Sequence, residues 1–186
     1  AGSHVHVDRS IEPSPATIFQ EASTPISSPT ETSAQRLKGL QSVWEQGYRG
    51  QGQTIAVIDS GIFPHADLKE HVAAWVDFCD DKPRMVDPLG HGTHVSGIIA
   101  GLPQGGETQC GVAYKVAKIM TVRAVPDGDE RDKDIANAVR YAVDNGAKVI
   151  NMSFGKPVSP GKEKVWEAFK YAQDKGVVLV HAAGND

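Results

Sequence analysis

The feature that most constrains the fold is a short apolar run at residues 54–58, which ends abruptly at Asp59. Apolar residues at nearly every position are typical of a strand that is buried on both faces, as in a parallel sheet covered by helices. Similar runs predict strands at 75–78, 116–122, 148–154 and 177–183. Helical periodicity lies between them, from His91 onward, at 135–143 and at 165–172. This alternation predicts an α/β fold, a parallel sheet with helices on both faces.

The first 32 residues have a different character. Residues 5–32 carry four prolines among many serines and threonines, and such a segment cannot bury enough apolar surface to order itself. We therefore expect a tail at 1–32 and the folded part at 33–186. Ser33 is expected to cap a first helix that ends near Gly47. Its predicted apolar face consists of Leu37, Leu40, Val43 and Trp44.

Composition excludes some classes of function. The net charge of −4 argues against nucleic-acid binding, which requires a basic face. No apolar run approaches the roughly 20 residues of a membrane span, and no signal peptide is visible in this chain. The two cysteines, Cys79 and Cys110, are not spaced as a zinc or redox pair. They could form one disulfide or remain two thiols.

Three polar residues are predicted to meet at one edge of the sheet. Sites in open parallel sheets form at the carboxyl ends of the strands, where Asp59 and Asn185 follow the first and last strands. His91 begins a helix between two glycines, where an imidazole can act as a general base. A carboxylate orients such an imidazole, and an amide stabilises an oxyanion. Taken singly, each residue is more typical of a cap, a turn or a loop.

Four sequence blocks resemble the subtilisin-like serine proteases, or subtilases. They lie at 57–62, 91–97, 151–155 and 182–185, and the resemblance extends from Ser33 to the end of the chain. It implies a subtilisin-like sheet, incomplete in this chain, and a serine endopeptidase that uses an Asp-His-Ser triad. It also implies that the tail at 1–32 could be a propeptide remnant.

The resemblance assigns roles to individual residues. Asp59 resembles the orienting acid, His91 the general base and Asn185 the side-chain oxyanion donor. The segment of Ser153, Phe154 and Gly155 resembles the strand that pairs with extended substrate. The segment of Ala182, Ala183 and Gly184 resembles one wall of the pocket that binds the residue before the scissile bond. His94 resembles a buried structural histidine.

The sequence also departs from the family pattern. The family's nucleophile lies in a Gly-Thr-Ser-Met-Ala stretch, which this sequence does not contain. We therefore expect this chain alone to be inactive. Its expected partners are a peptide or protein substrate and the remainder of the catalytic domain, or a second chain, that carries the serine. The resemblance implies a secreted or extracellular location and no cofactor for catalysis.

Structural calcium is a further expectation. Asp77, Asp80 and Asp81 resemble a calcium loop, although a third carboxylate of that loop would fall near Lys82. Residues 127–134 are rich in acidic side chains, which predicts either a preference for basic substrates or simply an acidic helix start.

Two alternative functions remain open at this point. One is a metal-dependent hydrolase that uses His91, His94 and Asp59, because histidines three residues apart can share a helix face. The other is a non-catalytic, protease-like fragment that binds peptide.

Overall fold

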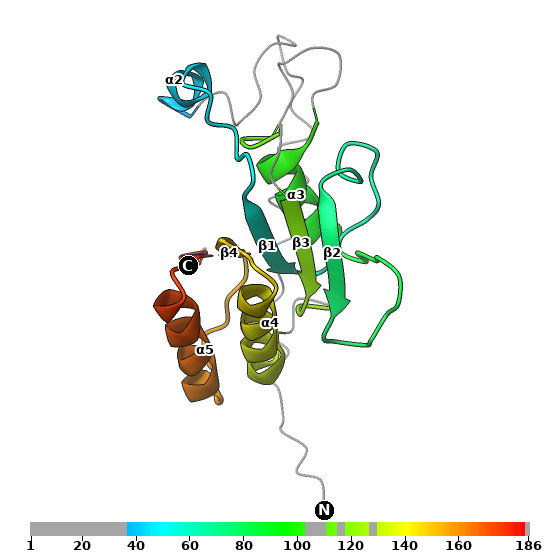
Figure 1. The fold of residues 1–186 in the computed structure, drawn as a ribbon. Helices are drawn as coiled ribbons and strands as arrows, with labels where there is room; N and C mark the ends of the chain where they lie inside the picture. The colour runs from blue at the N-terminus through cyan, green and yellow to red at the C-terminus, as the bar shows by residue number, and fades with distance from the viewer. Residues whose placement is uncertain (1–36, 103–110, 115–117, 127–129, 185–186) are drawn as a thin grey trace, which may run out of the picture.

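The computed structural model describes residues 37–102, 111–114, 118–126 and 130–184. Within them, five parallel strands form one sheet in the order β2-β3-β1-β4-β5, with helices on both faces (Figure 1). The predicted α/β architecture is therefore confirmed. The strands are β1 (Thr54–Asp59), β2 (Val72–Asp77), β3 (Lys118–Arg123), β4 (Val149–Met152) and β5 (Val178–His181). The helices are α2 (Leu40–Glu45), α3 (His91–Ala100), α4 (Asp132–Asp144) and α5 (Lys162–Asp174).

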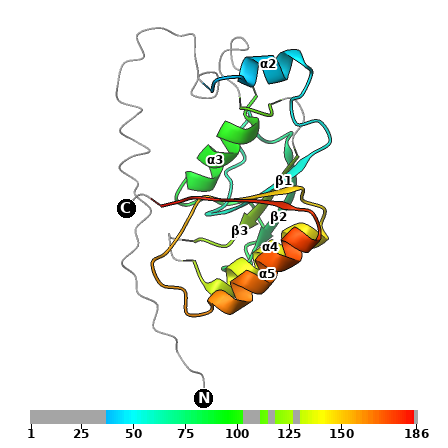
Figure 2. The same cartoon turned by 90° about the vertical axis from the view of Figure 1, so that its left-hand side faces the viewer.

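The central strand β1 explains the continuous apolar run. It pairs with β3 on one side and β4 on the other, so its backbone groups are bonded along both edges. Ala56 and Ile58 point into the core beneath α4 and α5, whereas Val57 points into the core beneath α3. Figure 2 shows these two helical layers on opposite sides of the sheet. Because side chains alternate along a strand, Asp59 lies on the same face as Val57, toward α3.

Helix α2 is shorter than the helix predicted between Ser33 and Gly47. It begins at Leu40, after Gly39 in a left-handed conformation, and Ser33 lies outside the described residues. Leu37 and Val43 are exposed, so the predicted apolar face is not buried as a whole. Trp44 alone is buried, because its indole packs edge-on against Tyr114 and donates a hydrogen bond to the carbonyl oxygen of Val112.

Helix α3 is also less buried than its sequence suggests. Its buried positions are Gly92, Ser96 and Ala100, which recur every four residues and form a single face. Ile98 is exposed on another face. The small residue Gly97 does not lie against a neighbouring backbone, since a Cβ atom there would meet nothing within 4 Å.

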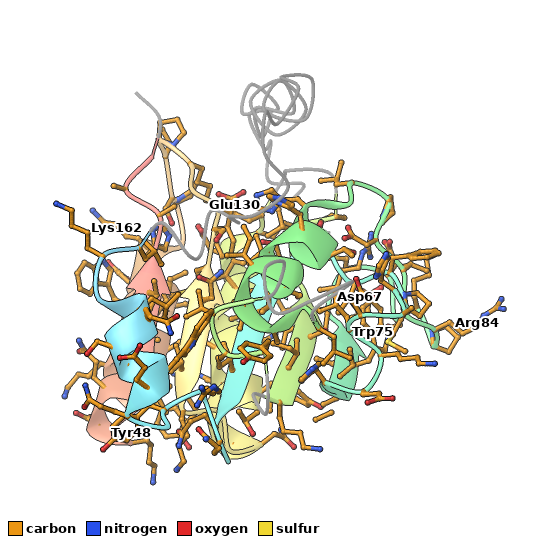
Figure 3. All side chains as sticks on the ribbon, turned by 90° about the horizontal axis from the view of Figure 1, so that it is seen from above. Tyr48, Asp67, Trp75, Arg84, Glu130 and Lys162 are labelled. Carbon is orange, nitrogen blue, oxygen red and sulfur yellow. The ribbon has the colours of Figure 1, made fainter. Side chains whose placement is uncertain are left out.

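Strands β4 and β5 form one side of the sheet. Strand β4 stops at Met152, so Ser153 and Phe154 lie in the loop beyond it and not in the predicted strand. Strand β5 lies at one edge of the sheet, with Val178 and Val180 exposed. Trp75 of β2 and Lys162 at the start of α5 lie toward opposite sides of the molecule (Figure 3).

No helix in the described ranges is long and apolar enough to cross a membrane. Cys79 is a free thiol, and its Sγ atom lies 3.7 Å from the carbonyl oxygen of Arg123. Cys110, the predicted tail at 1–32 and Asn185 lie outside the described residues.

Candidate active site

Asp59 and His91 form the centre of the candidate site. Asp59 is the last residue of β1 and His91 the first residue of α3, and Nδ1 of the imidazole lies 2.7 Å from Oδ1 of the carboxylate. The Asp59 side chain is 3% exposed and that of His91 is 23% exposed. An ionised carboxylate only accepts hydrogen bonds, so Nδ1 carries the proton and Nε2 is left as the basic nitrogen. The predicted pairing of these residues is confirmed.

The pKa of His91 lies above its ordinary value. The hydrogen bond with Asp59 is the main cause, and the negative charges of Asp59 and Asp87 add to it, whereas burial acts in the opposite direction. The surroundings of His91 thus stabilise its protonated, imidazolium form. A base that takes up a proton during a reaction benefits from this arrangement.

Asp87 fixes the start of α3. Its Oδ1 atom accepts hydrogen bonds from the Gly90 N–H at 3.0 Å and the Ser60 hydroxyl at 2.7 Å. Its Oδ2 atom accepts from the N–H and the hydroxyl of Thr93. The Ser60 hydroxyl oxygen in turn accepts from the Gly92 N–H at 3.0 Å. These contacts satisfy N–H groups that the first turn of a helix leaves without partners, and they hold His91 in place.

Glycine at position 92 is required by a close backbone approach. A Cβ atom there would lie 2.2 Å from the carbonyl oxygen of Gly61 and 3.2 Å from the Cβ atom of Asp59. The start of α3 can therefore approach the end of β1 only because residue 92 lacks a side chain.

The predicted substrate-binding segments follow the neighbouring strands. Ser153 accepts a hydrogen bond from the Asn151 side-chain amide at 2.9 Å, and the Phe154 ring packs edge-on against His181. The Ala182 N–H donates to the carbonyl oxygen of Met152 at 3.1 Å, which aligns the segment after β5 with the segment after β4. The structure thus brings together two sets of predicted residues: Ser153, Phe154 and Gly155, and Ala182, Ala183 and Gly184.

His94 is exposed, so the prediction that it is buried is wrong for this structure. The face of α3 that packs on the sheet is centred on Gly92 and Ser96. At about 100° per residue, position 94 points about 200° away from position 92. The metal-dependent alternative needed His94 beside His91 and Asp59, and no cluster of three potential ligands occurs in the described part of the chain.

Two aspartates of the predicted calcium loop, Asp77 and Asp80, have partners within the chain. Both carboxylate oxygens of Asp77 accept hydrogen bonds from the Arg123 guanidinium, at 3.1 and 2.9 Å. Backbone N–H groups of Cys79, Asp80 and Lys82 also donate to this carboxylate. Asp81 adopts a left-handed conformation and is exposed. A carboxylate surrounded by N–H donors and a guanidinium does not fit a calcium ion, which takes oxygen ligands.

Two aspartates of the acidic segment form ion pairs within the chain. Asp132 and Asp134 lie in the first turn of α4, where their negative charges interact favourably with the positive end of the helix dipole. Asp134 forms an ion pair with Arg131, and Asp132 forms one with Lys156. These contacts favour the helix-start interpretation. Residues 127–129 lie outside the described ranges.

Several residues of the site were not predicted to matter. Ser60, Asp87 and Arg123 were not singled out from the sequence alone. An aspartate followed by Pro88 shortly before a helix is a recognisable capping signal for Asp87. No comparable local signal marks Arg123, because its partners Asp77 and Ser60 lie 46 and 63 positions away.

Comparison with known proteins agrees with this geometry. Residues 50–186 match the model of the subtilase family, peptidase S8. Thermitase from Thermoactinomyces vulgaris is 39% identical over 138 residues, which cover 73% of this chain and 48% of thermitase. A thermophilic serine proteinase from Bacillus sp. strain AK1 is 39% identical over 145 residues, covering 77% of this chain and 35% of that protein. This chain thus spans half or less of the length of these relatives.

A solved structure of a protease from Pseudoalteromonas arctica superimposes with a TM-score of 0.68 at 30% identity, covering 80% of this chain and 54% of that one. Two other relatives, both from Bacillus subtilis, carry the names major intracellular serine protease and minor extracellular protease. Relationship alone therefore does not fix a cellular location. The match over residues 50–186, together with the sheet that places Asp59 against His91, shows that this chain belongs to the subtilase family of serine proteases.

Proposed function

We propose that this chain supplies the orienting acid and the general base of a serine endopeptidase that hydrolyses peptide bonds. The observation that supports this most directly is the 2.7 Å separation between Oδ1 of Asp59 and Nδ1 of His91. The serine is expected from the remainder of the catalytic domain or from a second chain. The substrates of the family are peptides or proteins.

In this proposal, Nε2 of His91 takes the proton from the serine hydroxyl while the serine oxygen attacks the carbonyl carbon of the scissile bond. The imidazolium that forms is stabilised by Asp59. It then gives its proton to the leaving amine as the C–N bond breaks, which leaves an acyl-enzyme. A water molecule hydrolyses that ester, and His91 acts first as base and then as acid again.

Other residues would bind the reacting groups. The side-chain amide of Asn185 is proposed to donate to the oxyanion of the tetrahedral intermediate. An extended substrate would pair with the segment after β4, at Ser153, Phe154 and Gly155. The residue before the scissile bond would enter a pocket with Ala182, Ala183 and Gly184 as one wall. Their juxtaposition through the Ala182 to Met152 hydrogen bond supports this placement.

Two further parts of the proposal concern the whole protein. Residues 1–32 are proposed to be a tail or propeptide remnant that precedes the catalytic part at 33–186. The protein is also proposed to act outside the cell. Fractionation of the producing cells, with detection of the protein in medium and lysate, tests the location.

The central experiment measures hydrolysis of a protein substrate by the protein assembled with a segment that carries the Gly-Thr-Ser block. Replacement of Asp59 by Asn or of His91 by Ala should abolish detectable hydrolysis, and labelling by a serine-directed fluorophosphonate should be lost with it. His65→Ala, at an exposed histidine, is the matched control. Peptide binding without hydrolysis in the unsubstituted protein would instead support the non-catalytic binding fragment.

A further inference from the structure

A buried guanidinium lies where three neighbouring strands end. Arg123 is the last residue of β3, and its register partners are Asp59 of β1 and Asp77 of β2. Its side chain is 4% exposed and that of Asp77 is fully buried. A buried charge is costly unless it is paired and hydrogen-bonded. The contacts that compensate for this cost should therefore be geometrically strict.

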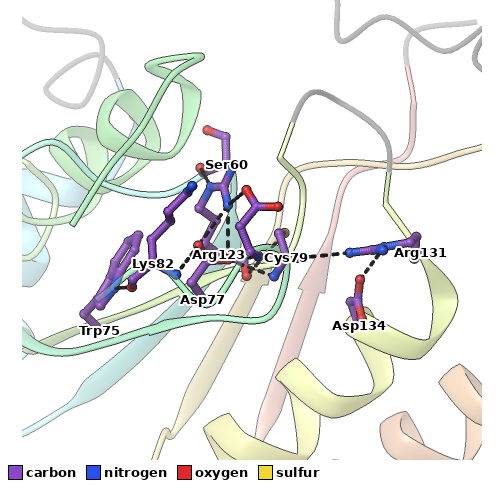
Figure 4. A network of polar contacts seen from close by, with 9 residues as sticks. Ser60, Trp75, Asp77, Cys79, Lys82, Arg123, Arg131 and Asp134 are labelled. Atoms are coloured by element: carbon purple, nitrogen blue, oxygen red, sulfur yellow. Dashed lines mark hydrogen bonds and ion pairs between the residues drawn. The ribbon is translucent and has the colours of Figure 1, made fainter. Parts of the chain in front are cut away.

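The guanidinium holds the turn that follows β2. Its Nη1 atom donates to both carboxylate oxygens of Asp77 and lies 3.0 Å from a carboxylate oxygen of Asp80. The turn closes with the Lys82 N–H on Asp77 and the Trp75 indole N–H on the Lys82 carbonyl oxygen. The positively charged side chain of Arg123 thus bridges the carboxylates of Asp77 and Asp80 (Figure 4).

The same guanidinium reaches the catalytic side of the sheet. Its Nε atom donates to the carbonyl oxygen of Ser60 at 3.1 Å. The Ser60 N–H donates to Oδ1 of Asp59 at 2.7 Å, the atom that also receives His91. The next two residues after Arg123, Ala124 and Val125, donate their N–H groups to the carbonyl oxygen of Asp59. The backbone on both sides of the Asp59–Ser60 peptide is therefore held from the end of β3.

We propose that Arg123 is a positioning residue that replaces a metal ion in the aspartate turn at 77–82 and, through the Ser60 carbonyl oxygen, holds Asp59 in register with His91. The catalytic meaning of this position rests on the proposed function of Asp59 and His91. A planar fork with donors in fixed directions suits this role, because it can satisfy Asp77, Asp80 and Ser60 at once. A lysine would keep the charge but lose the fork.

The first test uses the assembled, active protein. Arg123→Lys should lower kcat about tenfold with little change in KM, because a small displacement of a catalytic group slows the chemical step more than binding. It should also shift the NMR resonance of the deshielded Nδ1 proton of His91. Arg84→Lys, at an exposed arginine of the same loop, should change neither quantity. A folded Arg123→Lys variant with unchanged kcat and unchanged resonance would overturn the positioning role, provided that Asp59→Asn is inactive. If Asp59→Asn keeps activity, the proposed function itself fails.

The second test concerns the metal and does not depend on activity. Thermal unfolding midpoints are measured in excess calcium chloride and in EDTA for the unsubstituted protein, Asp80→Asn and Asp81→Asn. Asp80 is 48% exposed, so its substitution should leave the protein folded. Asp80→Asn should lower the midpoint equally in both solutions, because it removes a partner of Arg123. Asp81→Asn should be neutral. A calcium-dependent rise in midpoint that disappears only in Asp80→Asn would show that the turn binds calcium, and would overturn the replacement.

Discussion

Oδ1 of Asp59 accepts two hydrogen bonds of 2.7 Å each, one from Nδ1 of His91 and one from the N–H of Ser60. The backbone N–H of Ser60, directly after β1, thus orients the carboxylate, and the carboxylate in turn orients the imidazole. A bond from a side chain on α3 and a bond from the backbone after β1 meet on one oxygen atom. This shared acceptor makes the geometry of the candidate base sensitive to the position of every group that holds residues 59 and 60.

The activity of the assembled protein should rise with pH through a value above about 6.5, the ordinary pKa of histidine. The pKa of His91 is raised in the folded state, chiefly by the hydrogen bond with Asp59, and only the neutral imidazole can accept a proton. Asp87→Asn removes one of the raising charges, so the acid limb of the kcat profile should move to lower pH. Asp174→Asn, at an exposed carboxylate of α5, is the control. An acid limb that does not move would mean that Asp87 acts only through its hydrogen bonds.

The same shift has a consequence for stability. Because the folded pKa of His91 lies above the unfolded value, the protonated imidazole is bound more favourably in the folded state. This contribution to the free energy of unfolding is fully present below about pH 6.5 and is lost as pH rises through the folded pKa. His91→Gln should therefore flatten the pH dependence of stability in that window, as measured by urea unfolding at several pH values.

Two glycines of α3 should respond in opposite directions to alanine. Gly92→Ala places a methyl group against the Gly61 carbonyl oxygen, which is backbone and cannot move freely, so stability should fall by about 1–3 kcal/mol. Gly97→Ala meets nothing within 4 Å and should gain about 0.5–1 kcal/mol from reduced backbone freedom in the unfolded chain. Chemical denaturation of the pair checks this. Equal effects at both positions would contradict the close approach of α3 to β1.

The ion pair of Lys156 and Asp132 should stabilise the loop after β4. Lys156 Nζ lies 2.8 Å from Asp132, whose carboxylate also accepts from the Ser159 hydroxyl and the Gly161 N–H. Both side chains are less than one-fifth exposed, so Lys156→Met should cost about 2 kcal/mol. The exposed pair of Lys170 and Asp174 is the control, and Lys170→Met should cost about 0.5 kcal/mol or less.

Asp132 also predicts sensitivity to acid. Burial alone would raise its pKa, but the hydrogen bonds from Lys156, Ser159 and Gly161 outweigh burial and place it below the ordinary value. Its stabilising contribution is present above about pH 4, the ordinary range for an aspartate, and is lost as pH falls through the folded pKa. Asp132→Asn should therefore be less stable at neutral pH and lose less stability on acidification. Circular dichroism during acid titration measures both effects.

The thiol of Cys79 should be unreactive in the folded protein. Burial is the main cause that raises its pKa to about 12, and the carboxylates of Asp77 and Asp134 add to the effect. Because the thiolate is the nucleophile, iodoacetamide at neutral pH should label Cys79 only after unfolding. The experiment is done on a Cys110→Ser variant with mass spectrometric detection. Rapid labelling of the folded variant would show that the turn at 77–82 opens in solution.

The sequence determined the elements and the edge where the site lies. A strand buried on both faces needs apolar residues throughout, and residues 54–58 show this pattern before Asp59. Parallel strands end at a common edge, so Asp59 and the start of the helix at His91 could be placed together without coordinates. Each of these inferences rests on a pattern among residues that are close in the sequence. Such local patterns can be recognised without coordinates, and for that reason the inferences were correct.

Only the tertiary structure decided which polar groups support that edge. The hydrogen bonds of Ser60 with Asp87 and Gly92 span 27 and 32 positions. Those of Arg123 with Asp77 and Ser60 span 46 and 63 positions, and they form because β3 lies between β2 and β1. The exposure of His94 likewise depends on which face of α3 packs on the sheet. A local pattern cannot encode strand order or the rotation of a helix about its axis, since both are set by the packing of the whole sheet.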